Sequence, residues 1–121
     1  MVKGTFIEDI PLIPVLVTWN QLVQASYMVL DTGFTGDLQV TPKIAKELGL
    51  KPTGVTPARI ANGEVVPVLT APAFVTMEGE TNDMQVLISE SMPLAGISFL
   101  TKFGYIAIVD CKNREVSLEK A

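Results

Sequence analysis

The sequence predicts an all-β domain with a closed, barrel-like sheet, one α-helix and a protruding hairpin. Three observations support this class. Short apolar runs separated by turn residues recur along the 121 residues, residues 42–48 have marked helix ends, and Asn62-Gly63 lies between two strand-like runs. A chain of this length, 48% apolar and 18% charged, is expected to bury one core. We therefore expect a single domain over residues 1–121.

The first part of the chain predicts two long strands and a short one. Residues 15–19 and 22–30 are apolar, β-rich runs joined by Asn20-Gln21, the length of a two-residue hairpin turn. The first of these strands is expected to begin after Pro14, because proline cannot donate to a strand ladder. Residues 37–40 predict a third strand.

Residues 42–48 predict the helix. Thr41 is a good N-cap, and Pro42 occupies the first helical position, where its missing N–H breaks no helical bond. Gly49 is the expected C-terminal stop. Apolar side chains share one face of this segment: Ile44, Ala45 and Leu48.

A hairpin is expected around Asn62-Gly63, because Asn-Gly favours a tight turn with positive φ at both central residues. A two-residue loop there pairs Ala61 with Glu64 and Ile60 with Val65. The remaining elements are expected in this order: strand 68–77, a turn at 78–83, strand 84–88, a helical turn at 98–102, strand 105–109, a turn at 112–114 and strand 115–118. The total is roughly eight strands.

The composition excludes several kinds of active site. The chain has no histidine and one cysteine, Cys111, which rules out Ser-His-Asp and Cys-His nucleophilic sites, histidine-ligated zinc and an internal disulfide. Its net charge of −4 disfavours a nucleic-acid partner, and no apolar run is long enough to cross a membrane. We expect a cytoplasmic protein that uses no cofactor and no metal.

Residues 29–36, Val-Leu-Asp-Thr-Gly-Phe-Thr-Gly, contain the candidate for chemistry. Asp31 follows directly on a hydrophobic strand, so it lies at the end of that strand. Gly33 can offer its N–H to the carboxylate, and Thr32 and Thr35 supply hydroxyl groups that could orient it. Asp-Thr-Gly alone also fits an ordinary polar turn, so the surrounding sequence decides between the two interpretations.

Over about residues 14–118 the chain resembles the retropepsin-like aspartic proteases, the single-domain relatives of retroviral and pepsin-type enzymes. Four features carry the resemblance, in the right order: the strand entering Asp31-Thr32-Gly33, the helix at 42–48, the Asn62-Gly63 hairpin where the family has its flap, and residues 93–100, which look like the second signature of the family. A closing hairpin over residues 103–118 matches the usual ending. Order and spacing together are more specific than any one motif.

The resemblance implies a role for each residue of the loop. Asp31 would be the catalytic carboxylate, Gly33 would donate its N–H to it, and the Thr35 hydroxyl would steady its outer oxygen. Thr32 would bond across a two-fold axis to the loop of a partner. Phe34 stands where many members have a small residue, so it either narrows a substrate pocket or simply packs.

The second signature and the flap complete the implied site. Leu94, Ala95 and Gly96 would pass close behind the catalytic loop, with Gly96 leaving room for it. The flap would cover the substrate with these residues: Ile60, Ala61, Asn62, Gly63, Glu64 and Val65.

The mechanism of the family needs two carboxylates that share one water and one proton. The chain has a single Asp-Thr-Gly, and its other aspartates lack the flanking pattern: Asp9, Asp37, Asp83 and Asp110. The resemblance therefore implies a C2 homodimer in which Asp31 of each copy faces the other. A peptide or protein substrate would lie between the subunits as an added strand.

Two other functions stay open at this point. A dimer of this fold could bind extended peptides without cutting them, or could serve as an assembly domain. A metal-dependent hydrolase would need oxygen ligands, and the available carboxylates have no convincing ligand spacing: Glu8, Asp9, Asp31, Asp37 and Asp83.

Overall fold

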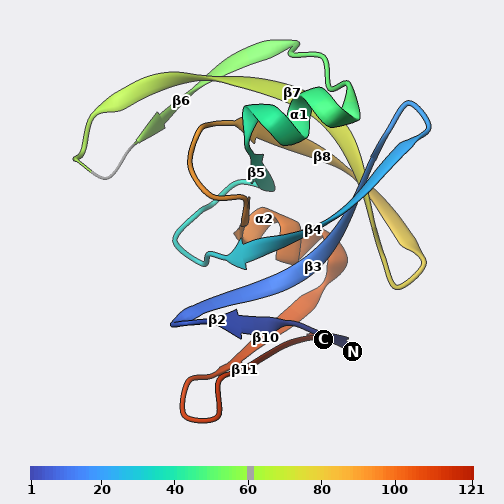
Figure 1. The fold of residues 1–121 in the computed structure, drawn as a ribbon, viewed down its shortest axis with the longest axis vertical. Helices are drawn as coiled ribbons and strands as arrows, with labels where there is room; N and C mark the ends of the chain where they lie inside the picture. Colours follow the sequence, from blue (N-terminus) through green and yellow to red (C-terminus); the bar gives the residue numbers. More distant parts are fainter. Residues whose placement is uncertain (60–61) are drawn as a thin grey trace.

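The computed structural model describes residues 1–59 and 62–121, and over these residues it has eleven strands and two helices (Figure 1). In chain order they are β1 (Val2–Lys3), β2 (Thr5–Ile7), β3 (Ile10–Trp19), β4 (Leu22–Leu30), β5 (Leu38–Val40), α1 (Pro42–Leu48), β6 (Gly54–Arg59), β7 (Val65–Met77), β8 (Glu80–Ile88), β9 (Leu94–Ala95), α2 (Ile97–Phe103), β10 (Tyr105–Asp110) and β11 (Glu115–Lys120). The predicted mostly-β class is confirmed. The prediction of a single helix was wrong.

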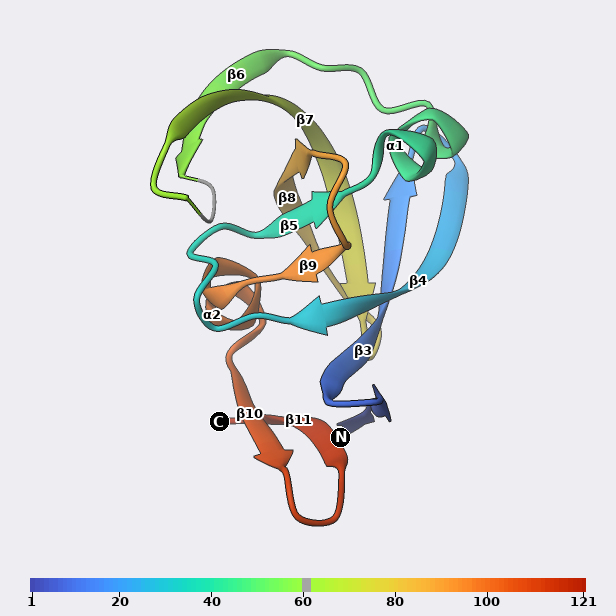
Figure 2. The same cartoon turned by 60° about the vertical axis from the view of Figure 1, so that its left-hand side comes forward.

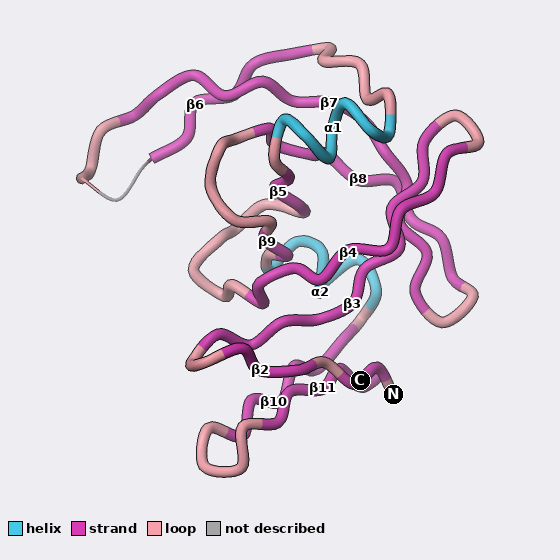
Figure 3. The backbone as a smooth tube through the Cα atoms, viewed as in Figure 1, coloured by secondary structure: helices cyan, strands magenta, loops and turns pink. Residues whose placement is uncertain are grey.

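The strands of the described residues form a larger and a smaller sheet (Figure 3). The eight strands of the larger sheet run in the order β2-β3-β4-β9-β5-β8-β7-β6, and β3 also pairs with β7. The smaller sheet has the order β1-β11-β10 and holds both termini, at the lower end of the view in Figure 1.

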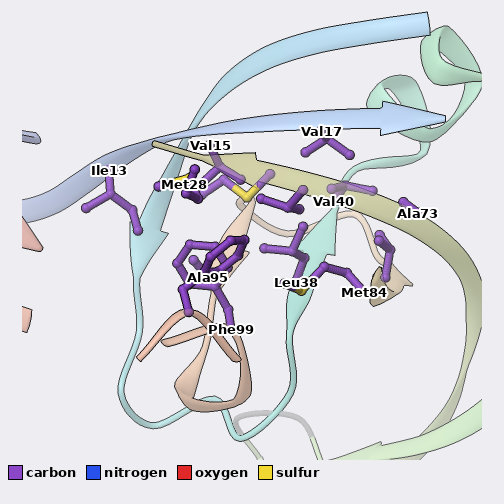
Figure 4. Packing of buried hydrophobic residues seen from close by; sticks show 14 of the residues in the cluster. Ile13, Val15, Val17, Met28, Leu38, Val40, Ala73, Met84, Ala95 and Phe99 are labelled. Atoms are coloured by element: carbon purple, nitrogen blue, oxygen red, sulfur yellow. The ribbon is translucent and has the colours of Figure 1, made fainter. Parts of the chain in front are cut away.

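The core is built from alternating positions of the strands, because successive side chains of a strand point to opposite faces. In β3, Ile13, Val15 and Val17 are buried, whereas Leu16 between them is exposed. Figure 4 shows side chains of β3, β4, β5 and α2 meeting in this core, among them Met28, Leu38 and Phe99. Burial of each such side chain contributes about 1.5–3 kcal/mol to stability.

Two elements agree with the sequence because their signals are local. Trp19 pairs with Leu22 across Asn20-Gln21, and both turn residues have positive φ, as a two-residue hairpin turn requires. Helix α1 begins where Thr41 accepts a hydrogen bond from the Ile44 N–H at 3.2 Å. It ends at Gly49, whose φ is 66°.

Several predicted strand boundaries were wrong, most clearly the starts of β3 and β8. β3 begins at Ile10 and runs through Pro14. At Pro14 the strand pairs with β4 on one side and has no partner on the other, so the missing N–H of proline need not break a hydrogen bond between strands. β8 begins at Glu80, because the polar turn contains only Glu78-Gly79, both with positive φ. Two short N-terminal strands, β1 and β2, were not predicted.

The helical turn expected at residues 98–102 is the full second helix, α2. Phe99, Leu100 and Phe103 give it a buried face, but its N-cap, Gly96, has no side chain to mark the start. Both helices have seven residues, and none in the described part of the chain is long and apolar enough to cross a bilayer.

The β6–β7 hairpin has a different register from the predicted one. Val65 pairs with Arg59, not with Ile60, so this register does not match a two-residue turn at Asn62-Gly63. The Asn62 Oδ1 accepts the Glu64 N–H at 2.9 Å, a local bond that competes with a tight turn. Ile60 and Ala61, and therefore the predicted pairing of Ala61 with Glu64, lie outside the described residues.

Candidate active site

Asp31 lies directly after the buried end of β4. Its backbone N–H donates to the Ala95 carbonyl at 3.0 Å, which ties the residue to β9. The Gly33 N–H donates to the Asp31 Oδ1 at 2.9 Å, so the loop itself orients the carboxylate. The side chain is therefore held by its own backbone and remains partly exposed.

Strand β9 and the start of α2 pass behind the loop that carries Asp31, as Figure 2 shows. Ala95 pairs with Leu30 of β4 on one side and with Leu38 of β5 on the other, so the short β9 joins the strands that flank the loop. The N–H groups of residues 96–98 then donate to loop carbonyls. These bonds are Gly96 to Asp37 at 3.0 Å, Ile97 to Phe34 at 2.9 Å and Ser98 to Gly36 at 3.2 Å.

Gly96 is required by space. A Cβ atom at this position would lie 2.3 Å from the Gly36 carbonyl oxygen and 2.5 Å from that of Phe34. The φ of Gly96, −107°, is open to any residue, so crowding alone explains the glycine. The Phe34 ring covers Gly36 in the same way, because a Cβ on Gly36 would lie 2.6 Å from the ring tip.

Asp37, at the far end of the loop, is a buried carboxylate with a different role. Its Oδ2 accepts the Lys102 Nζ at 2.8 Å and the Gln85 N–H at 2.8 Å. Burial raises the pKa of Asp37, but hydrogen bonds from Lys102, Ser98 and the Gln85 backbone outweigh it and hold the pKa below its usual value. Asp37 thus stays ionised and ties the loop to α2 and β8.

Asp31 lines a pocket of about 480 Å³. The described residues that line it come from the loop, β5, β6, β8 and β9: Asp31, Gly33, Phe34, Thr35, Gly36, Gln39, Thr56, Pro57, Ala58, Arg59, Gln85, Leu87 and Leu94. The sequence left open whether Phe34 borders a pocket or packs against the protein. Its ring does both, because it lies against Gly36 and Gly96 and also lines the pocket.

Several residues expected at the site lie elsewhere. The tip of the β6–β7 hairpin is exposed and does not line the pocket: Asn62, Gly63, Glu64 and Val65. Ala95 and Gly96, by contrast, lie behind the loop where they were expected, and Thr32 is exposed. In the described part of the chain, the Thr35 hydroxyl makes no hydrogen bond to Asp31.

The sequence analysis missed much of the pocket wall, namely Gly36, Gln39, Thr56, Pro57, Ala58, Arg59, Gln85 and Leu87. A signal existed for two of them. Gln39 and Gln85 each stand between two buried apolar residues of a strand, so they point away from the core and into the pocket. The residues of β6, Thr56 to Arg59, became neighbours of Asp31 only through the pairing of β6 with β7.

A second cavity of about 480 Å³ lies where the N-terminal strands meet β11. Glu115 is the one carboxylate among the described residues that line it, and it lacks the loop geometry of Asp31. Among residues 1–59 and 62–121, no group of three or more acidic or cysteine side chains is placed to hold a metal ion.

Comparisons with known proteins address the fold. No protein-family model and no curated protein sequence matches the chain. Among solved structures, EIAV protease complexed with the inhibitor HBY-793 superposes with a TM-score of 0.65 at 18% identity, over 85% of this chain and 96% of that one. A retropepsin-like aspartic protease from Rickettsia conorii gives 0.60 at 18% identity, over 98% and 89%. The chain therefore has the fold of the retropepsin-like aspartic proteases.

Proposed function

We propose that this protein is an aspartic endopeptidase that acts as a C2 homodimer, with one Asp31 from each copy. The observation that carries the proposal is the placement of Asp31, oriented by the Gly33 N–H, at the edge of a pocket large enough for a side chain. The fold shared with EIAV protease supports it.

The second carboxylate has to come from another copy. Asp31 is the one carboxylate among the described residues that line the pocket. Three of the four other aspartates are engaged elsewhere. Asp37 pairs with Lys102, Asp9 pairs with Arg114, and Asp110 accepts the Asn113 backbone and side-chain N–H groups.

The two Asp31 carboxylates hold one proton and one water between them. One carboxylate takes a proton from the water, which attacks the scissile carbonyl carbon, while the protonated carboxylate donates to the carbonyl oxygen. The resulting tetrahedral intermediate collapses as the amide nitrogen takes the proton that the first carboxylate removed from the water and leaves as the amine, while one diol hydroxyl returns its proton to the second carboxylate. The substrate lies extended, bonded through its backbone, and the pocket takes one of its side chains.

The surrounding structure suits this task. Backbone bonds from β9 and α2 fix the catalytic loop, so little reorganisation is needed during the reaction. Thr32 is exposed and can bond the loop of the second copy. The β6–β7 hairpin covers the substrate through Thr56 and Ala58, which already line the pocket.

Cleavage of an unfolded protein, measured from acid to alkaline pH, tests the proposal. We expect hydrolysis that declines on the alkaline side as the shared proton is lost, that stops with an inhibitor mimicking the tetrahedral intermediate, and that persists with a chelator. Binding of the unfolded protein without cleavage at any pH would contradict the proposal and favour a peptide-binding module. Loss of cleavage with the chelator would favour a metal-dependent hydrolase.

A further inference from the structure

We infer that the pocket beside Asp31 selects a substrate residue with a carboxamide side chain, and glutamine in particular. The inference rests on the proposed function, because it assigns the substrate side chain that the endopeptidase takes into this pocket. The choice of glutamine rests on the side chains of the pocket floor and on the hydrogen bonds that they leave open.

The floor of the pocket is formed by three side chains of two neighbouring strands. β5 and β8 pair in parallel, with Gln39 directly beside Leu87. Gln85 precedes Leu87 by two residues, so it lies on the same face of β8, about 7 Å along the strand. All three residues line the pocket. An apolar side chain therefore lies between two carboxamides.

Strand β6 forms the roof over this floor, and in Figure 2 the β6–β7 arm arches over β5. Thr56 and Ala58 are half-buried and line the pocket, whereas Val55 and Pro57 beside them are exposed. Because side chains alternate along a strand, Thr56 and Ala58 face the floor. A substrate side chain that enters between floor and roof therefore contacts Leu87 and Ala58 with its methylene groups.

The hydrogen bonds of Gln39 fix which end of its carboxamide is open to a ligand. Its Nε2 donates to the Ser91 Oγ and, at 3.3 Å, to the Met92 carbonyl. A carbonyl oxygen can only accept, so the amide nitrogen must lie on that side. The Gln39 Oε1 is therefore left as an acceptor for a donor that enters the pocket.

Gln85 leaves a hydrogen-bond donor open. Its backbone N–H donates to the Asp37 Oδ2 at 2.8 Å, which fixes the strand at this position. Within residues 1–59 and 62–121, the side-chain amide of Gln85 has no hydrogen-bond partner. Its Nε2 can therefore donate to an acceptor in the pocket.

A glutamine side chain matches this arrangement. Its NH2 group donates to the Gln39 Oε1, its amide oxygen accepts from the Gln85 Nε2, and its two methylene groups cover Leu87. Methionine has a similar length but neither polar group. It would leave both carboxamides without partners in a pocket from which it has displaced water, and such a mismatch lowers affinity.

Charged side chains match the pocket less well. Glutamate has no donor for Gln39 and brings a negative charge beside Asp31. Arg59 is the one cation among the described residues that line the pocket, but its Nη1 donates to the Gly63 carbonyl at 2.9 Å. Arg59 also alternates with Ala58 along β6, which places it at the rim. Lysine has no acceptor to offer, and its charge is costly to dehydrate.

A peptide library tests this choice without requiring cleavage. Random octapeptides displayed on phage are selected for binding to the Asp31→Asn protein, which keeps the pocket. We expect glutamine to be enriched over methionine about tenfold at one position of the bound peptides. The absence of such enrichment at every position, or a preference for methionine or glutamate, would overturn the inference.

Variants of Gln85 in the same Asp31→Asn protein locate the selection in this pocket. Gln85→Leu removes the donor and should abolish the preference for glutamine, whereas Gln85→Lys supplies an ammonium group and should shift the preference toward glutamate. Gln21→Leu is the matched control, because it makes the same change on an exposed turn outside the pocket, and it should leave the preference unchanged. Circular dichroism checks that all variants fold. A glutamine preference that survives both Gln85 variants would contradict the assignment.

Cleavage sites separate this inference from the activity itself. In a digest of unfolded proteins by the parent, glutamine should be enriched at one fixed distance from the cleaved bonds. Cleavage with no such enrichment would keep the protease and reject the choice of glutamine. Selection of glutamine peptides by a protein that cleaves nothing would keep the pocket assignment and reject the protease.

Discussion

Replacing Asp31 by asparagine is expected to lower the rate of peptide hydrolysis about 10⁴-fold or more while leaving the fold and the dimer unchanged. Asparagine has nearly the same shape and can still accept the Gly33 N–H through its Oδ1. It cannot take a proton from the attacking water. The measurement is kcat/KM for a peptide that the parent protein cleaves, with the oligomeric state of the variant checked in parallel.

Asp9→Asn is the matched control for this substitution. Asp9 is 96% exposed, lies outside the pocket and pairs only with Arg114 in the described structure. We expect its kcat/KM to equal that of the parent. Parent-like cleavage by Asp31→Asn would show that Asp31 is not the catalytic group.

Asp37→Ala is expected to lower the free energy of unfolding by about 2 kcal/mol, because it leaves the Gln85 N–H without its acceptor, whereas the half-exposed Lys102 ammonium can still be solvated. Asp9→Ala breaks an exposed ion pair and should change stability by only about 0.5 kcal/mol. Urea unfolding of the three proteins at neutral pH measures both values. Equal losses for the two variants would contradict a stabilising role of the buried Asp37 carboxylate.

The stability that Asp37 contributes should depend on pH, because the pKa of Asp37 is lowered in the folded protein. A carboxylate whose pKa is lower in the folded than in the unfolded state stabilises the fold above its unfolded value, here 3.8, and loses that contribution as the pH falls through the folded value. The gap in stability between parent and Asp37→Asn should therefore be full at about pH 6 and should narrow as the pH falls below 3.8. A gap that stays the same as the pH falls below 3.8 toward strongly acidic values would contradict this role of Asp37.

The sequence predicted the parts of the fold that depend on neighbours in the chain. The Asn20-Gln21 turn and the ends of α1 were correct because a turn or a cap is specified within a few residues. β9 was not predicted as a strand, since two residues form one only when β4 and β5 lie on either side of them. The register of the β6–β7 hairpin failed for a different reason, because the Asn62 side chain accepts the Glu64 N–H, a local bond that competes with a tight turn.

The site also has a part that is set by neighbouring residues in the chain and a part that is set by the tertiary fold. The Asp31 loop could be located from the sequence because the carboxylate, its Gly33 donor and the preceding strand are contiguous. The opposite wall of the pocket could not, since Thr56 and Ala58 approach the loop only after β6 pairs with β7. The tertiary fold, and not any local motif, makes those residues part of one pocket with Asp31.

Mixing the parent protein with its Asp31→Asn variant tests most directly whether two copies build one active site. After subunit exchange, an equal mixture should have about one quarter of the activity of the same total amount of parent, because only parent–parent dimers contain both carboxylates. Across mixtures, activity should follow the square of the parent fraction. Activity that falls in linear proportion to the parent fraction, with about one half remaining in the equal mixture, would show that each copy works alone and would contradict the shared site.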